Sequence, residues 1–145
     1  MIRWERGGSL ILRKLWSEKY RPATFNGVVS QESIVEEMKA VVESGQMQNY
    51  IFYSPEPGTG KTTMARILAL EMGWEIHTFN ASSKKQRGIE FVEEEVGPLS
   101  RTGDECLIFL DEADRLTIQA QDALKGVIEN ATCWFILACN DLSKV

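Results

Sequence analysis

A glycine-rich run in the first half of the chain has the residue types and the spacing that bind phosphate. It reads Pro57-Gly58-Thr59-Gly60-Lys61-Thr62-Thr63 and comes soon after the short apolar run Tyr50–Tyr53. Glycines let backbone N–H groups turn towards an anion, and the N-terminus of a following helix adds the positive end of its dipole. We expect Lys61 to reach the β- and γ-phosphates of a nucleotide and the hydroxyl of Thr62 to bind Mg²⁺. The run therefore predicts a phosphate-binding loop for ATP, with Mg²⁺ as its cofactor.

One position of this loop departs from the strict phosphate-loop pattern. The pattern has glycine five residues before Gly60, where this chain has Pro55. The alternative interpretation is a glycine-rich turn ahead of a helix that binds no ligand. Turn chemistry alone gives no reason for lysine and threonine directly after the glycines. The binding loop is therefore the favoured interpretation.

Acidic residues directly follow another apolar run, Cys106–Leu110, in the order Asp111-Glu112-Ala113-Asp114. If that run is a parallel strand, they lie at its carboxyl end, where open α/β sheets bind ligands. We expect Asp111 to hold Mg²⁺ through water and Glu112 to polarise the attacking water as a general base. Alternatively, these carboxylates cap the next helix. Their occurrence together with a phosphate loop favours the hydrolytic role.

A polar residue, Asn140, ends the last apolar run, Cys133–Cys139. At the carboxyl end of a neighbouring strand its amide could orient the same water and sense the γ-phosphate. The alternative is an ordinary turn asparagine ahead of Asp141. The predicted catalytic residues are thus Lys61, Glu112 and Asn140.

Alternating strand and helix patterns supply the elements that would position these residues. Four apolar runs are short and rich in aromatic or β-branched side chains, as buried strands are; they are Tyr50–Tyr53, Trp74–Phe79, Cys106–Leu110 and Cys133–Cys139. Apolar residues at helical spacing separate them, at Ile67–Leu68, Ile89–Leu99 and Ala120–Ile128. This alternation predicts an α/β fold, a Rossmann-like parallel sheet with helices on both faces.

A further helix is predicted ahead of the first strand, over Ile34–Val42, with Ser30 as its N-cap and Gly45 as its stop. Before it, the first residues show neither helical nor strand periodicity. We therefore expect residues 1–14 to form a flexible extension and residues 15–145 to form the domain.

The composition fits one soluble domain. The chain has 145 residues, 43% of them hydrophobic and 26% charged, and a net charge of −5 that argues against a generally basic surface. The longest apolar run near the start, Leu10-Ile11-Leu12, is too short for a membrane span or an export signal, so we expect a cytoplasmic chain. Three cysteines in strand-like runs are predicted to be buried reduced thiols: Cys106, Cys133 and Cys139.

Three segments together resemble the small subunits of AAA+ sliding-clamp loaders. Leu15-Trp16-Ser17-Glu18-Lys19-Tyr20-Arg21-Pro22 resembles the box that opens these subunits, and Asn80-Ala81-Ser82 with Arg87-Gly88-Ile89 resembles their second-strand motif. Asp111-Glu112-Ala113-Asp114 with Asn140 completes the set. The resemblance covers roughly residues 15–145 and is to replication factor C small subunits. At Ser54-Pro55-Glu56-Pro57 the chain is more similar to the clamp loaders of T-even-like phages.

The resemblance implies an adenine pocket near the start of the domain, lined by Tyr20, Arg21, Pro22, Val28 and Val29. Stacking and apolar surfaces suit that role. The alternative is that Tyr20 and Pro22 only pin the N-terminal segment to the sheet.

The resemblance also implies that the helix after the second strand faces primer–template DNA. Lys84, Lys85 and Arg87 then become candidate phosphate contacts. The alternative is a solvated helix start, and the nearby Glu93, Glu94 and Glu95 are interpreted as a solvated face.

The implied function is that of an ATP-hydrolysing domain of a clamp-loader subunit, with other subunits, a sliding clamp and primer–template DNA as partners. Two other functions stay open: another AAA+ machine that remodels DNA, and a nucleotide-binding module without turnover. In an infected or nucleated cell the expected location would be a viral replisome or the nucleus.

The family's Ser-Arg-Cys motif, with the arginine finger given to a neighbouring subunit, is not found in this sequence. Neither are its fifth strand, helical lid and collar. We therefore expect a fragment, a split gene product or a truncated reading frame, with Tyr50–Tyr53 left as a bare apolar edge of the sheet. Alone, the chain is expected to be almost inactive.

Overall fold

Five parallel strands form one sheet in the computed structural model, which describes residues 2–3, 32–55 and 60–145. Their order across the sheet is β1-β2-β5-β4-β3, so neighbouring strands are joined by crossovers rather than hairpins. The strands are β1 (Ile2–Arg3), β2 (Tyr50–Tyr53), β3 (Glu75–Asn80), β4 (Cys106–Asp111) and β5 (Trp134–Cys139).

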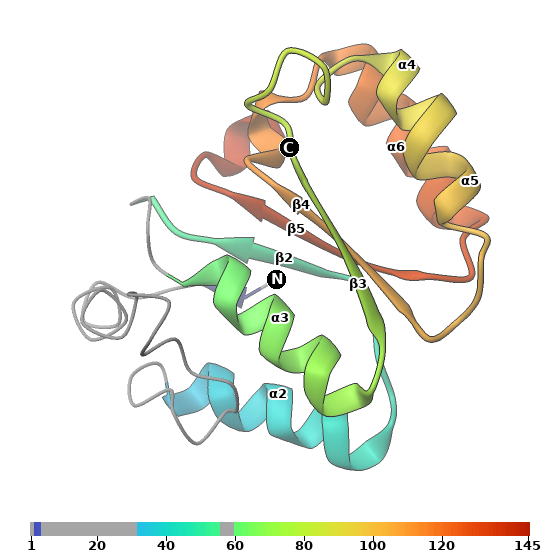
Figure 1. The fold of residues 1–145 in the computed structure, drawn as a ribbon. Coiled ribbons are helices and arrows are strands. Elements are labelled where there is room, and N and C mark those ends of the chain that lie inside the picture. The colour runs from blue at the N-terminus through green and yellow to red at the C-terminus, as the bar shows by residue number, and fades with distance from the viewer. Residues whose placement is uncertain (1, 4–31, 56–59) are drawn as a thin grey trace.

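Helices cover both faces of this sheet, as Figure 1 shows. On one face lie α2 (Glu32–Ser44) and α3 (Lys61–Met72). On the other lie α6 (Ile118–Glu129) and a helical segment made of α4 (Ile89–Phe91), the π-helix η3 (Val92–Val96) and α5 (Gly97–Leu99). Two short 3₁₀ turns, η4 (Ala113–Arg115) and η5 (Leu142–Lys144), follow β4 and β5.

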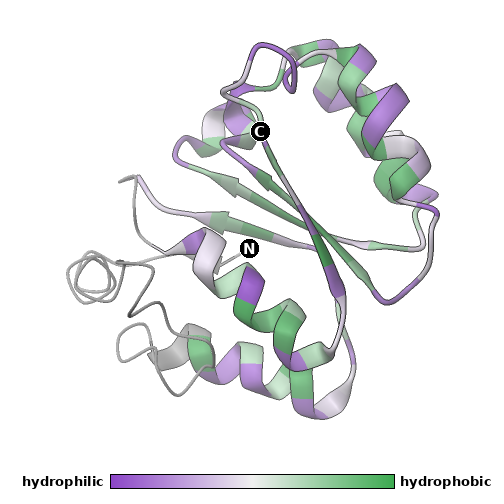
Figure 2. Cartoon of the chain, in the orientation of Figure 1, coloured by the Kyte–Doolittle hydropathy of each residue, from purple (hydrophilic) through white to green (hydrophobic). Residues whose placement is uncertain are grey.

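The apolar side chains form two buried clusters, one on each face of the sheet. Phe52, Phe109 and Ile136 pack with the helices α2 and α3 on one face. Ile108 and Phe135 pack with α4, η3 and α6 on the other. Figure 2 shows the central strands as predominantly hydrophobic, while the helices carry polar residues on their outer sides. The sheet is thus buried on both faces, as parallel sheets in α/β proteins are.

The predicted strands are confirmed, with ends shifted by at most one residue. The helix before β2 is confirmed as well, and Gly45 follows its end with a positive φ of 68°. Ser30, the predicted N-cap, lies outside the described residues. All three cysteines are buried and free, as predicted. Within the described ranges no helix is long and apolar enough to cross a membrane.

The edge of the sheet beside β2 differs from the prediction. Ile2 pairs with Phe52 and Arg3 with Tyr53, in parallel. The expectation of a bare edge at Tyr50–Tyr53 is therefore wrong, as is that of a flexible extension for Ile2–Arg3. Free N–H and C=O groups on an edge strand pair readily with any extended segment, and two residues are too few to show periodicity in the sequence. The rest of the predicted extension, residues 4–14, lies outside the described residues.

The helix predicted over 89–99 contains a wider π turn at Val92–Val96. Pro98 has no N–H and cannot donate to the carbonyl four residues earlier. Instead, the Gly97 N–H donates to the Val92 carbonyl, five residues back. The π turn thus lies directly before Gly97 and Pro98, within an otherwise α-helical segment.

Candidate functional site

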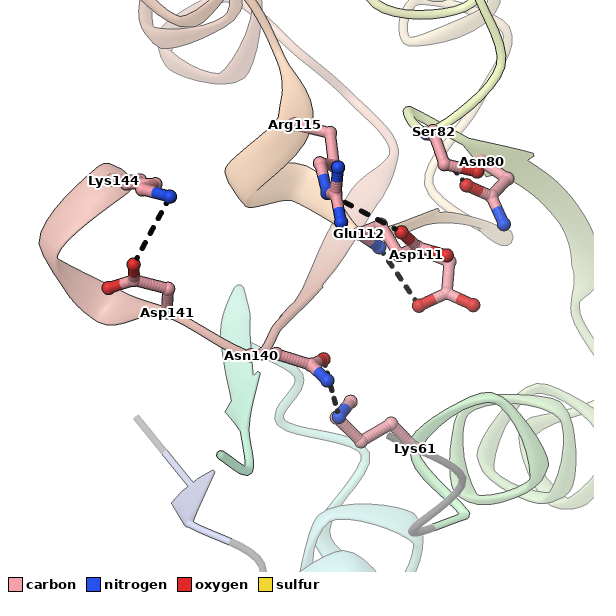
Figure 3. A network of polar contacts seen from close by, with 9 residues as sticks. All are labelled: Lys61, Asn80, Ser82, Asp111, Glu112, Arg115, Asn140, Asp141 and Lys144. Atoms are coloured by element: carbon pink, nitrogen blue, oxygen red, sulfur yellow. Dashed lines mark hydrogen bonds and ion pairs between the residues drawn. The ribbon is translucent and has the colours of Figure 1, made fainter. Parts of the chain in front are cut away.

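The carboxyl ends of four strands meet at one edge of the sheet. The register pairs Tyr53 with Cys139 and Asn80 with Asp111, so the strands end side by side. Backbone bonds continue the pairing one residue further: the Ser54 N–H donates to the Cys139 carbonyl at 3.2 Å. This edge is where open α/β sheets bind ligands. Figure 3 shows the polar side chains that gather there.

Lys61 is the first residue of α3 and reaches back across this edge. The preceding Gly60 has φ 90°, a left-handed conformation that glycine adopts without steric cost. Lys61 is only 6% exposed, and its Nζ donates a hydrogen bond of 3.2 Å to Oδ1 of Asn140 (Figure 3). Burial lowers the pKa of Lys61, while the Asp111 carboxylate opposes that shift. Two predicted catalytic residues, 79 positions apart, are thus in direct contact.

Asp111, at the end of β4, interacts with Glu112 and with Thr62. Its Oδ1 accepts a 2.9 Å hydrogen bond from the backbone N–H of Glu112, and the nearby Thr62 side chain helps to lower the pKa of its carboxyl. Burial raises the pKa of Asp111, while the Glu112 N–H, Lys61 and Thr62 act in the opposite direction. The two residues predicted to hold Mg²⁺, Thr62 and Asp111, therefore lie together.

This pair fits a magnesium site. Mg²⁺ prefers oxygen ligands and is usually held by one or two carboxylates together with substrate phosphates and water. A threonine hydroxyl beside a carboxylate at the start of a phosphate loop supplies that chemistry. No cluster of three or more His, Cys, Asp or Glu side chains that could bind a metal occurs in the part of the chain that the structure describes. The remaining ligands of such a magnesium site would be oxygens of the nucleotide and of water.

Glu112 has an unusual backbone. Its φ of 51° and ψ of 43° are left-handed, and within the described ranges it is the one non-glycine residue with a positive φ. That conformation costs about 1–2 kcal/mol for an L-residue, and such residues cluster at functional sites. Its carboxylate lies 3.8 Å from Nε of Arg115.

The alternative role of these carboxylates as helix caps is wrong. The N-cap of α6 is Thr117, whose Oγ1 accepts a 3.2 Å hydrogen bond from the Ala120 N–H. Glu112 precedes the 3₁₀ turn η4 but makes no side-chain capping bond to it. Asp111 and Glu112 are therefore not needed to start the helix that follows.

A hydroxyl in the phosphate loop has no partner. Oγ1 of Thr63 is buried and makes no hydrogen bond in the described structure. A buried polar group left unsatisfied costs about 1–3 kcal/mol. A phosphate oxygen bound to this loop would satisfy it, so this observation fits a nucleotide.

Comparison with known proteins assigns the family. The model of the ATPase family associated with various cellular activities (AAA) matches residues 50–145, which include the four strand ends and every site residue placed above. The chain belongs to the AAA family of ATPases.

Curated relatives of this AAA chain include replication factor C small subunits. That of Methanoregula boonei is 40% identical over 141 residues, covering 90% of this chain and 44% of the relative. That of Archaeoglobus fulgidus is 37% identical over 142 residues, covering 91% of this chain and 44% of the relative. The chain thus spans less than half the length of these relatives.

Solved structures with the same fold include the Holliday junction branch migration motor RuvB of Thermotoga maritima. It superposes with a TM-score of 0.71 at 22% identity, covering 86% of this chain and 43% of RuvB. At this identity the likeness concerns the fold alone. It confirms the predicted α/β architecture.

The predicted DNA-contacting residues lie on the loop between β3 and α4, which starts at the same edge of the sheet. Lys84, Lys85 and Arg87 are all exposed. The carbonyl of Arg87 accepts a 2.9 Å hydrogen bond from the Thr117 N–H, which fixes the end of this loop against the start of α6. Their role stays a prediction. The exposure of Glu93–Glu95 agrees with a solvated face.

Several predicted site residues lie outside the described part of this AAA domain. They are the adenine-pocket residues Tyr20, Arg21, Pro22, Val28 and Val29, and Pro57, Gly58 and Thr59 of the phosphate loop. Their roles stay predictions from the sequence.

One residue beside the site was missed in the sequence. Arg115 pairs with Glu112, three positions earlier, in the turn after β4. Opposite charges three positions apart favour an ion pair on an α-helix, so the sequence could have indicated this contact. Here the two residues lie in a 3₁₀ turn instead.

Proposed function

We propose that this chain is the ATP-binding and ATP-hydrolysing domain of a sliding-clamp-loader subunit, which loads a ring clamp onto primer–template DNA during replication. The observation that carries the ATPase part is the convergence of Lys61 and Asn140, in contact at 3.2 Å, beside the neighbouring residues Thr62 and Asp111. The clamp-loader part is supported by the 40% identity to a replication factor C small subunit.

Each residue of the site has a defined part in this proposal. Lys61 binds the β- and γ-phosphates, and Asn140, its hydrogen-bond partner, senses the γ-phosphate and orients the attacking water. Thr62 and Asp111 hold Mg²⁺, which when bound would neutralise charge on the phosphate oxygens. Glu112 polarises the water as general base. The adenine would lie against the pocket residues named above for that role.

Binding to a clamp tests the proposed assembly. The purified chain, or the longer protein that contains it, should retain a purified ring clamp encoded by the same genome when ATP and Mg²⁺ are present. As a matched control, the same assay uses a purified protein that binds a branch-migration helicase. Retention of the helicase partner and not of the clamp would assign the chain to a different AAA machine.

The basic loop gives a prediction about DNA. If Lys84, Lys85 and Arg87 contact phosphates, replacing all three by alanine should weaken primer–template binding by the assembled complex. Because each contact releases counterions, the log–log slope of affinity against salt should flatten by about 2–3. The measurement is fluorescence anisotropy over a salt series. A control with equal charge change replaces three other exposed basic residues: Arg66, Arg101 and Lys125. If the salt slope is unchanged when Lys84, Lys85 and Arg87 are replaced, these residues face solvent and do not contact DNA phosphates.

A further inference from the structure

Two of the three buried thiols lie opposite one another in the sheet. The strands β4 and β5 are parallel neighbours (Figure 1), and their register pairs Leu107 with Trp134. Carried back by one residue, this register sets Cys106 opposite Cys133. Both side chains belong to the apolar cluster on the α6 face of the sheet. The two sulfur atoms therefore lie on the same side of two adjacent strands.

The spacing of this pair suits a disulfide. Neighbouring strands lie about 4.8 Å apart, within the range of about 4.4–6.8 Å that separates the Cα atoms of disulfide-bonded cysteines. Burial raises the pKa of Cys106 to about 12, and the Cys133 thiol adds to this shift, which agrees with their being close together. The third thiol, Cys139, ends β5 and has Tyr53 of β2 as its register partner.

The pair lies just beneath the loop between α5 and β4. Cys106 is 5% exposed and Cys133 is 3% exposed. Oγ1 of Thr102, an exposed residue of that loop, lies 3.6 Å from Sγ of Cys133. Sγ of Cys133 also donates a 3.3 Å hydrogen bond to the Leu99 carbonyl. A small molecule therefore reaches Cys133 once the Thr102 side chain moves aside.

We propose that Cys106 and Cys133 form a redox-active modification site, which a peroxide converts to a disulfide between β4 and β5. Cys133 attacks first, because it lies beneath the exposed Thr102. Its sulfur bonds to one peroxide oxygen, the O–O bond breaks, and one water leaves a sulfenic acid behind. The Cys106 sulfur then attacks the sulfenic sulfur, the S–S bond forms, and a second water carries away the Cys106 proton. Two thiols are oxidised and one peroxide is reduced to two waters.

The disulfide should form slowly and stabilise the fold. The thiolate is the reactive form of cysteine, and Cys106 stays protonated at neutral pH because of its raised pKa. Once formed, the bond closes the segment from Cys106 to Cys133, which contains α6. Closing a loop of this length removes entropy from the denatured chain, which should raise the Tm of a domain of this size by roughly 5–12 °C.

The test treats the folded chain with hydrogen peroxide and locates disulfides by mass spectrometry of unreduced peptides. We expect one disulfide, between Cys106 and Cys133, in the wild type and in Cys139→Ala, and none in Cys106→Ala or Cys133→Ala. Dithiothreitol should restore the free thiols. The calorimetric Tm of the oxidised wild type should exceed that of the reduced wild type by the stated amount, and Cys133→Ala treated in the same way should show no such rise.

The chain unfolded in guanidinium chloride is a second control, because its three cysteines should pair without preference. The proposal is overturned if peroxide that oxidises the unfolded chain leaves Cys106 and Cys133 of the folded chain as thiols, or links them to Cys139 or to another molecule. It is also overturned if the Tm of the wild type does not rise on oxidation, because the disulfide would then strain the sheet. Should an alanine variant fail to fold, the wild type and Cys139→Ala decide. No nucleotide takes part, so the outcome is independent of the proposed function.

Discussion

Replacing Lys61 by alanine should weaken ATP binding severely while the fold stays intact. The side chain is nearly fully buried at the start of α3, and its ammonium group points at the edge where the phosphates are proposed to bind. Hydrogen bonds to charged groups contribute about 1.5–3 kcal/mol each. Losing two of them, to the β- and γ-phosphates, should weaken binding by at least about 10²-fold.

Calorimetric titration with ATP and Mg²⁺ measures this loss, and circular dichroism checks the fold. Arg66→Ala is the control, because it removes an exposed positive charge from the same helix. Lys61→Met separates charge from packing, since methionine keeps the apolar stem in the buried position. Equal ATP affinity in wild type and Lys61→Ala would remove Lys61 from the phosphate site.

Hydrolysis by the isolated chain should be very slow, and a second polypeptide should accelerate it. In the proposed clamp loader, the ATP site is completed by an arginine finger from a neighbouring subunit. In related phosphoryl-transfer enzymes such a finger contributes about 10³–10⁵ in kcat, because it stabilises charge in the transition state. We therefore expect an increase of that order when the chain meets a subunit carrying the Ser-Arg-Cys motif.

The measurement is ATP turnover of the purified chain with and without that subunit. The control subunit has alanine in place of the arginine of its Ser-Arg-Cys motif, and it should bind the chain without accelerating turnover. Brisk hydrolysis by the chain alone would contradict the neighbour's proposed role.

The sheet and much of the site could be predicted because short, contiguous sequence patterns indicate them. Four strands are short apolar runs, and packing on both faces of a parallel sheet demands such runs. Glu112 and Asn140 directly follow two of these strands, so strand order alone brings them to one edge. The glycines ahead of Lys61 likewise indicate a loop followed by a helix.

Other features depend on contacts that no local sequence pattern indicates. The hydrogen bond between Lys61 and Asn140 joins residues 79 positions apart, and it requires β2 and β5 to be neighbours. The pairing of Ile2–Arg3 with β2 involves too few residues for a pattern. The left-handed turn at Glu112, which places Arg115 beside its carboxylate, involves no glycine that would have indicated it.

Glu112→Gln separates ATP binding from ATP hydrolysis at this site. The change keeps the shape of the side chain but removes its ability to accept a proton, which should reduce hydrolysis by about 10²–10⁴-fold. The decisive measurement is single-turnover ATP hydrolysis by the chain with its activating subunit, alongside calorimetric ATP affinity. We predict that Glu112→Gln binds ATP as tightly as wild type and releases almost no phosphate. Hydrolysis that continues at the wild-type rate in Glu112→Gln would contradict the assignment of the general base and of the catalytic site built around it.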